Sequence, residues 1–450
     1  MITGVGILTL LVGLFCFYNI SLKEISTNSK ELSAMVLMSE KEMLTIQDKN
    51  NIIYSIQNCN KNLKPGDSIL LEYTGLLNKN SETQNISITS CNTVYTMNEE
   101  EFPNNWEDEG IFHNYYNLAY QKVKELTLEE KIAQFLLVRY PDFNPINTLK
   151  KYPFGGYIFF EKDFNDKTKQ EVKNMMKELQ DTAKIPLLTA VDEEGGKVVR
   201  ISSNSNLADK KFQSPSELYL AGGMEKIKAD TIKKSSLLKE LGINLNLAPV
   251  IDVTTDPNAY MYERTIKEGT GITSNYAKTV IQASKGSGVS YTLKHFPGYG
   301  NNTDTHLGTA TDNRSYDDIL NNDLPPFETG ITAGVEAVLV SHNIVTSIDP
   351  DSPASLSTNI HNLLRNELHF TGIIITDDLS MNALDNIPNS AIRAILAGND
   401  LLISTNYEED ITSIKNAITN KTIAEETINK LATRIIAWKY YKGLIIPNQK

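Results

Sequence analysis

Residues 289–306 read VSYTLKHFPGYGNNTDTH and pass from an apolar run into a loop crowded with ionisable groups. Residues 289–295 have the apolar character and length of a buried strand, and they end on Lys294 and His295. Gly and Pro then prevent a regular helix or strand from continuing to Asp304 and His306. Because two of the six histidines lie in this stretch, we favour a proton-transfer loop over a polar surface loop that holds histidines by chance.

Eight apolar runs of this kind occur from residue 134 onward, and amphipathic segments such as 169–183 and 360–368 separate most of them. Buried parallel strands that alternate with helices over about 330 residues predict an α/β fold, the TIM (β/α)8 barrel. A doubly wound open sheet is the alternative. The eight runs are residues 134–140, 155–160, 185–192, 243–252, 289–295, 337–342, 372–377 and 400–404.

Polar side chains gather at the carboxyl ends of five of these runs. The five ends are Asp192, Asp252, Lys294 with His295, Ser341 with His342, and Asp377. A single terminal Asp could merely cap the next helix. Five polar ends instead predict one shared site, because the active site of a TIM barrel lies on this face.

The composition is that of a globular protein, with 40% hydrophobic and 22% charged residues in 450. The net charge of −12 argues against a nucleic-acid partner, because phosphate binding needs clustered Lys and Arg.

Residues 2–20, ITGVGILTLLVGLFCFYNI, carry no charge and are long enough to span a bilayer. We expect an uncleaved membrane anchor over residues 1–23, with the rest of the chain at the extracytoplasmic face of the cell membrane. A cleaved signal peptide, with secretion, is the main alternative. A buried core helix is a third.

Residues 24–110 differ in character from the rest. Residues 21–48 carry mixed charge and predict a helix or a stalk, whereas short β-type runs in 50–98 predict a small β module such as a sandwich. Residues 97–110 are acidic and predict a linker to a catalytic barrel over 111–445. Cys59 and Cys91 could pair in an exported protein, although two residues leave this open.

The motifs of residues 124–440 together resemble glycoside hydrolase family 3, specifically its bacterial β-N-acetylglucosaminidase branch. The order and spacing of these motifs carry the resemblance. They are residues 126–134 (LTLEEKIAQ), 155–159 (GGYIF), 192–200 (DEEGGKVVR), 247–253 (LAPVIDV), 263–265 (ERT), 294–306 (KHFPGYGNNTDTH), 353–357 (PASLS) and 375–381 (ITDDLSM).

The resemblance implies roles for three residues. Asp377 corresponds to the nucleophile that forms a covalent glycosyl-enzyme with retention of configuration. His306 corresponds to the general acid/base, and Asp304 would orient its imidazole. The alternative for Asp377 is a helix cap.

Six further residues resemble the sugar-binding set of the family: Asp192, Arg200, Arg264, Lys294, His295 and His342. The alternative is a structural ion-pair network at the barrel mouth. The resemblance implies a GlcNAc-containing glycan such as a peptidoglycan fragment as substrate, with no metal and no cofactor. We expect a monomer.

The chain departs from the family pattern at two places. Tyr299 stands where the family usually has His, and residues 307–310 (LGTA) lack a frequent Pro. Four other functions stay open: another family 3 β-glycosidase, a GlcNAc phosphorylase, a non-catalytic glycan-binding wall protein and a metal-dependent barrel hydrolase. Phosphorolysis is considered because an imidazole base repels phosphate less than a carboxylate would.

Overall fold

The computed structural model describes residues 29–39, 41–48, 53–63, 67–77, 85–95, 109–300, 304–305, 308 and 310–445. Contacts divide the chain into two compact units, Met1–Glu101 with Ile446–Lys450, and Phe102–Ile445.

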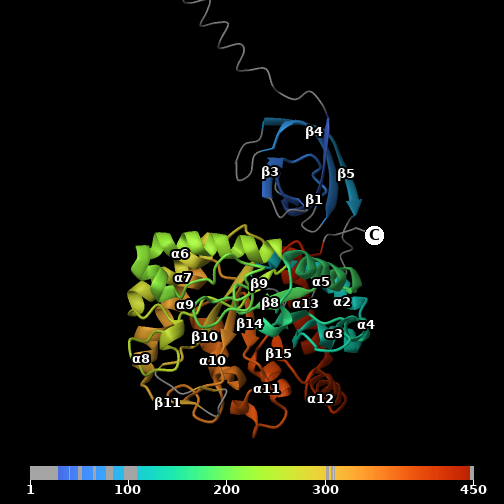
Figure 1. Ribbon diagram of the computed structural model, residues 1–450. Helices are drawn as coiled ribbons and strands as arrows, with labels where there is room; N and C mark the ends of the chain where they lie inside the picture. Colours follow the sequence, from blue (N-terminus) through green and yellow to red (C-terminus); the bar gives the residue numbers. More distant parts are fainter. Residues whose placement is uncertain are drawn as a thin grey trace, which may run out of the picture. The chain divides into compact units, whose positions relative to one another are not determined.

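The second unit is built around eight parallel strands whose order in the sheet follows their order in the chain (Figure 1). This order confirms the prediction of a TIM-like α/β fold over the doubly wound alternative. The strands are β6 (Leu136–Arg139), β7 (Gly156–Phe159), β8 (Leu188–Val191), β9 (Leu245–Asn246), β10 (Ser290–Phe296), β12 (Ala337–Val340), β14 (Ile373–Thr376) and β15 (Leu402–Ser404).

The sheet returns on itself to form a nearly closed barrel. β15 pairs with β6 along three residues, whereas β14 and β15 meet through one parallel bridge between Ile375 and Leu401. Backbone hydrogen bonds from Thr376 N to Leu401 O (3.0 Å) and from Leu379 N to Ile403 O (3.0 Å) complete this seam.

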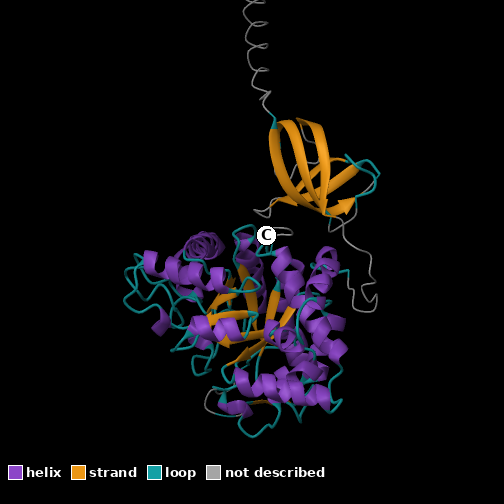
Figure 2. Cartoon of the chain, turned by 90° about the vertical axis from the view of Figure 1, so that its right-hand side faces the viewer, coloured by secondary structure: helices purple, strands orange, loops and turns teal. Residues whose placement is uncertain are grey.

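Helices surround the barrel strands, as Figure 2 shows in purple around orange. Between β6 and β15 strands and helices alternate as the periodicity predicted, and helices also precede β6. The helices of six or more residues are α2 (Tyr116–Lys124), α3 (Leu128–Gln134), α4 (Pro145–Lys151), α5 (Lys169–Thr182), α6 (Pro215–Glu240), α7 (Thr270–Ser284), α9 (Leu324–Thr332), α11 (Ser390–Ala397), α12 (Tyr407–Thr419) and α13 (Glu425–Tyr441). Shorter helices include α8 (Tyr316–Asp318) and α10 (Thr358–Asn362), and the short strands β11 (Thr311–Asp312) and β13 (Ile344–Val345) pair outside the barrel.

Local sequence sets where several helices begin. Before α5 the Thr168 hydroxyl accepts from Glu171 N while the Glu171 carboxylate accepts from Thr168 N, and Ser214 with Glu217 does the same before α6. Such a capping box satisfies amide groups that lack partners in the first turn of a helix.

The first unit contains one antiparallel sheet in the order β3-β2-β1-β4-β5. The strands are β1 (Lys30–Ser39), β2 (Met43–Asp48), β3 (Ile53–Gln57), β4 (Ser68–Leu76) and β5 (Asn85–Tyr95). The prediction of a helix within 21–48 is wrong over the described part, because pairing of β1 with β4 and β2 overrides the helix propensity of its Lys, Glu and Ala. Over its described residues the module is also one sheet rather than a sandwich.

A disulfide joins Cys59, which follows β3, to Cys91 in β5. It links the edge strand β5 to the segment that follows the other edge strand, β3. Side chains such as Val36, Leu44 and Leu71 are fully buried inside the module.

Two predicted segments lie wholly or mostly outside the described residues. The expected membrane anchor over 1–23 is one, and the linker over 97–110 is the other, since only its residues 109 and 110 are described. Within the described part of the chain, no helix combines the length and the apolar character needed to cross a bilayer.

A lysine of α13 is buried against the end of α3. Lys439 on α13 is 0% exposed, and its Nζ donates to Gln134 Oε1 (2.9 Å). Burial lowers the pKa of Lys439 from its ordinary 10.5 to about 7.

We predict that replacing both Cys59 and Cys91 by Ser destabilises the β module by about 3–4 kcal/mol, because a cross-link across 32 residues restricts the unfolded chain. Hydrogen exchange of the full chain should then show faster exchange in β1–β5 and unchanged exchange in the barrel strands. Equal acceleration in both units would contradict the assignment of the disulfide to the module alone.

We predict that Lys439→Met stabilises the protein more at pH 6 than at pH 9.5. The unfolded state binds more protons between the folded pKa of about 7 and the ordinary 10.5, so the stability of the wild type rises with pH across this window. Urea unfolding at the two pH values checks this. Lys415→Met, at an exposed ion pair with Glu129, is the control and should show little pH dependence. A gain from Lys439→Met that is the same at both pH values would refute the buried-charge explanation.

Candidate active site

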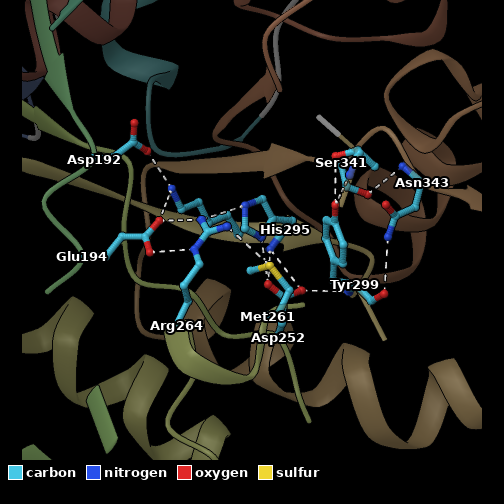
Figure 3. Close-up of polar contacts among 11 residues, drawn as sticks. Asp192, Glu194, Asp252, Met261, Arg264, His295, Tyr299, Ser341 and Asn343 are labelled. Atoms are coloured by element: carbon cyan, nitrogen blue, oxygen red, sulfur yellow. Dashed lines mark hydrogen bonds and ion pairs between the residues drawn. The ribbon is translucent and has the colours of Figure 1, made fainter. Parts of the chain in front are cut away.

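The polar residues predicted to share a site follow the carboxyl ends of the barrel strands. Asp192 comes directly after β8 and Asp377 directly after β14. Lys294 and His295 lie near the carboxyl end of β10. Short polar contacts join several of these side chains (Figure 3). The fold therefore brings together residues that are up to 185 positions apart, counting from Asp192 to Asp377.

Lys294 lies at the centre of this cluster. Its ammonium is 2.7 Å from Asp192 Oδ1 and 2.7 Å from Glu194 Oε1. Arg264 binds the same Glu194 carboxylate with two nitrogens, Nε at 3.0 Å and Nη2 at 2.7 Å. Two cations and two carboxylates thus compensate one another in a site where Lys294 is only 3% exposed.

The mutual pairing keeps these groups charged. Burial alone would raise the pKa of Glu194, but Arg264 and Lys294 lower it well below its ordinary range. Burial would lower the pKa of Lys294, but Asp192 and Glu194 raise it above its ordinary value. Near neutral pH the cluster therefore offers fixed cations and carboxylates that can bond to sugar hydroxyls.

Arg200 extends the cluster from the other side of Asp192. Its Nη2 lies 3.6 Å from Asp192 Oδ2, and its guanidinium lies over the Phe160 ring at 5.4 Å from the centroid. The aromatic face and the carboxylate together hold the guanidinium at the edge of the site.

His295 is oriented by Asp252. Nδ1 of His295 donates to Asp252 Oδ2 (2.8 Å), and Nε2 lies 3.5 Å from Arg264 Nη2. Asp252 also accepts from the backbone of Tyr299 (2.8 Å), so one carboxylate fixes both an imidazole and the loop after β10.

Asp377 directly follows β14, and its carboxylate accepts a hydrogen bond from the backbone of the next residue. Its Oδ1 accepts from Asp378 N (2.9 Å) and its backbone N donates to Val340 O (3.1 Å). Burial raises the pKa of Asp377, but His342, His295, the Asp378 N–H and Lys294 outweigh it, so the net pKa is lowered. An ionised carboxylate at this position can act as a nucleophile.

His342 supports the Asp377 segment. It is fully buried, with Nδ1 2.7 Å from Ser355 Oγ and Nε2 2.9 Å from the backbone oxygen of Asp378. Because a carbonyl only accepts, Nε2 carries a proton and donates to it. Both ring nitrogens are engaged with the protein.

The expected acid/base pair is described only in part. Asp304 lies beside Tyr260 and is hydrogen-bonded to it. Burial and the Asp304 carboxylate raise the pKa of Tyr260, and they outweigh Arg264, which lowers it. Asp304 is therefore connected through Tyr260 to the Arg264 cluster. His306 lies outside the described residues.

Sequence reasoning placed Asp252 at the shared site without giving it a role, and it did not assign Glu194 or Tyr260 to the site. Glu194 stands two residues after Asp192 in a motif, and Asp252 ends a strand, so both carried a signal. Tyr260 carried no such signal, because the sequence around it does not indicate that its side chain contacts Asp304. In the described ranges, no three His, Cys, Asp or Glu side chains are grouped to hold a metal ion.

Residues 127–438 match the family model described as the glycosyl hydrolase family 3 N terminal domain. A β-hexosaminidase from Xanthomonas campestris pv. campestris (strain B100) is 32% identical over 233 residues, which are 51% of this chain and 69% of that protein. The resemblance that the motifs indicated is thus confirmed.

Two solved structures are similar to this chain. A glycoside hydrolase family 3 β-N-acetylglucosaminidase from Paenibacillus sp. str. FPU-7 superposes with a TM-score of 0.66 at 28% identity, over 72% of this chain and 64% of that one. A β-N-acetylhexosaminidase from Beutenbergia cavernae DSM 12333 superposes with a TM-score of 0.63 at 25% identity, over 70% of this chain and 99% of that one.

We predict that Glu194→Gln lowers the free energy of unfolding by about 2–4 kcal/mol, because Arg264 and Lys294 lose a buried countercharge while the amide keeps some hydrogen bonds. Glu129→Gln breaks an exposed pair with Lys415 and should cost less than about 1 kcal/mol. Urea unfolding measures both. Equal losses would show that the Glu194 cluster is not electrostatically important.

Proposed function

The chain belongs to glycosyl hydrolase family 3, and from this premise we propose that it is a retaining exo-β-N-acetylglucosaminidase. The family match and the named relatives support a glycosidase of the β-hexosaminidase type. The observation that carries the mechanism is the Asp377 carboxylate at the end of β14, where His342, His295 and Lys294 lower its pKa.

In the first step of the proposed reaction, Asp377 attacks the anomeric carbon of a terminal β-linked GlcNAc. The bond from that carbon to the leaving oxygen breaks, and His306 gives its proton to this oxygen. The sugar is then an ester of Asp377, and the His306 imidazole is neutral. Asp304 would stabilise the imidazolium before the transfer, as a carboxylate does beside a catalytic histidine.

In the second step, water attacks the same carbon and gives a proton to His306. The bond to Asp377 breaks, the carboxylate is restored and the sugar leaves with its original β configuration. An imidazole suits both directions because its ordinary pKa lies near neutrality.

The charged cluster supplies binding. Lys294 and Arg264 can donate to sugar oxygens and Asp192 can accept from hydroxyls, while pairing among them keeps each charge in place. Arg200 and His295 lie at the borders of the same cluster and complete the proposed sugar-binding set. His342 acts through the Asp377 segment in this proposal, since Ser355 and Asp378 bind its ring nitrogens.

We propose a peptidoglycan fragment or a related GlcNAc-containing glycan as the substrate, and the extracytoplasmic face of the cell membrane as the location. The Cys59–Cys91 disulfide supports an oxidising compartment. The charge-free segment 2–20 supports attachment to the membrane.

Asp377→Asn should lower kcat/KM on an aryl β-N-acetylglucosaminide by about 1,000-fold or more, since an amide cannot form the glycosyl ester. Asp378→Asn is the matched control, because its carboxylate bonds to Thr405 and Ser380 and it should lose no more than about tenfold. Near wild-type turnover by the Asp377 variant would remove it from the role of nucleophile. A wild type that prefers the aryl β-glucoside would shift the assignment to another β-glycosidase.

His306→Ala should lower kcat/KM by about 100-fold or more on a phenyl β-N-acetylglucosaminide, whose leaving group needs a proton. The dinitrophenyl analogue leaves without one, so kcat/KM for it should change by less than about threefold. A leaving-group series measured on both proteins tests this. Equal losses across the series would count against His306 as the general acid.

A further inference from the structure

Tyr299 is held at three points in the loop after β10, although the catalytic steps proposed above do not use it. Its side chain is 2% exposed, and its backbone N donates to Asp252 Oδ1 (2.8 Å) while its backbone O accepts from Asn343 Nδ2 (3.4 Å) (Figure 3). The ring packs between His295, at 5.6 Å between centroids, and Tyr260, at 5.8 Å. Its position is therefore fixed by residues of the active site itself.

The hydroxyl group of Tyr299 makes the third attachment. Thr305 N donates to this oxygen (3.0 Å), and the same oxygen lies 2.8 Å from Thr305 Oγ1. Because the phenol oxygen accepts from the amide, its own hydrogen is available to Oγ1. Burial raises the pKa of Tyr299, so the hydroxyl keeps this hydrogen near neutral pH.

The loop on either side of Tyr299 has little room to move. Gly298 and Gly300 have φ values of +130° and +59°, and a Cβ at these positions would come within 2.3 Å of Asp323 Oδ1 and 2.8 Å of Arg314 Nη2. Arg314 and Asp323 are themselves an ion pair at 2.7 Å. The glycines on both sides of Tyr299 thus pack closely against the partly exposed Arg314 and the buried Asp323.

We propose that Tyr299 is a positioning residue for the acid/base pair and that it acts through Thr305. Thr305 is 1% exposed and stands in the chain directly between Asp304 and His306. Adjacent Cα atoms are about 3.8 Å apart, so a fixed Thr305 limits where both neighbours can lie. This inference rests on the proposed glycosidase function.

The geometry gives a reason for Tyr rather than the His that the family usually has at this position. A phenol oxygen accepts and donates at one atom, so it can hold the amide and the hydroxyl of Thr305 together. A single imidazole nitrogen either accepts or donates. Replacement of Tyr299 by Phe or His therefore removes at least one of the two bonds.

The test compares kcat/KM for phenyl and dinitrophenyl β-N-acetylglucosaminides in full-chain variants. Tyr299→Phe should lose about 10- to 100-fold on the phenyl substrate and less than about threefold on the dinitrophenyl one, because a misplaced acid matters only when the leaving group needs a proton. Tyr291→Phe is the matched control. It removes a buried phenol from β10, the strand that precedes the loop, where the hydroxyl bonds to Ser235 (3.0 Å) on α6, and it should show no such selectivity.

Two substitutions at Thr305 test the contact from its other side. Thr305→Ser keeps both bonds to Tyr299 and should retain the wild-type leaving-group dependence, whereas Thr305→Val loses the Oγ1 bond and should show part of the Tyr299→Phe selectivity. These variants keep the proposal testable if Tyr299→Phe does not fold.

Equal losses on both substrates, or no loss in folded Tyr299→Phe and Thr305→Val, would overturn the positioning role while leaving the glycosidase assignment intact. A wild type inactive on both aryl N-acetylglucosaminides would instead overturn the proposed function, and the positioning role with it.

Discussion

The ammonium of Lys294, held 2.7 Å from both Asp192 and Glu194, is the interaction on which the rest of the site depends. A buried cation is stable only when its charge is compensated, so the ends of β8 and β10 must stay together. Arg264 repeats this constraint from a separate segment by binding Glu194 twice. The barrel thereby presents a charged, rigid surface beside Asp377 without a ligand being needed to assemble it.

The same strand that carries Lys294 also leads to the loop that holds the proposed acid/base pair. Asp252 accepts from His295 on one oxygen and from the backbone of Tyr299 on the other, so the end of β10 and the loop after it share one carboxylate. The Tyr299 hydroxyl in turn hydrogen-bonds to the amide and the hydroxyl of Thr305. A loop that supplies an imidazole for proton transfer needs such support, because a displacement of about 1 Å can cost about 100-fold in rate.

Hydrophobic runs and polar strand ends were enough to predict the barrel and the face that carries the site. Other features depended on contacts that a sequence does not reveal. Lys30–Ser39 contains helix-favouring residues, yet pairing with β4 makes it a strand. Three acids stand side by side at 192–194, but only the structure shows that the Glu193 carboxylate binds backbone amides of Arg200 and Ile201, whereas Glu194 binds Arg264 and Lys294.

In the proposed reaction, the sugar is bound covalently to Asp377 between two displacements at the anomeric carbon. The most direct measurement is proton NMR of the first GlcNAc released from an aryl β-N-acetylglucosaminide, recorded before the anomers equilibrate. Two inversions restore the starting configuration, so the account predicts that the β anomer appears first. An α anomer as the first product would mean a single displacement by water and would contradict a covalent role for Asp377.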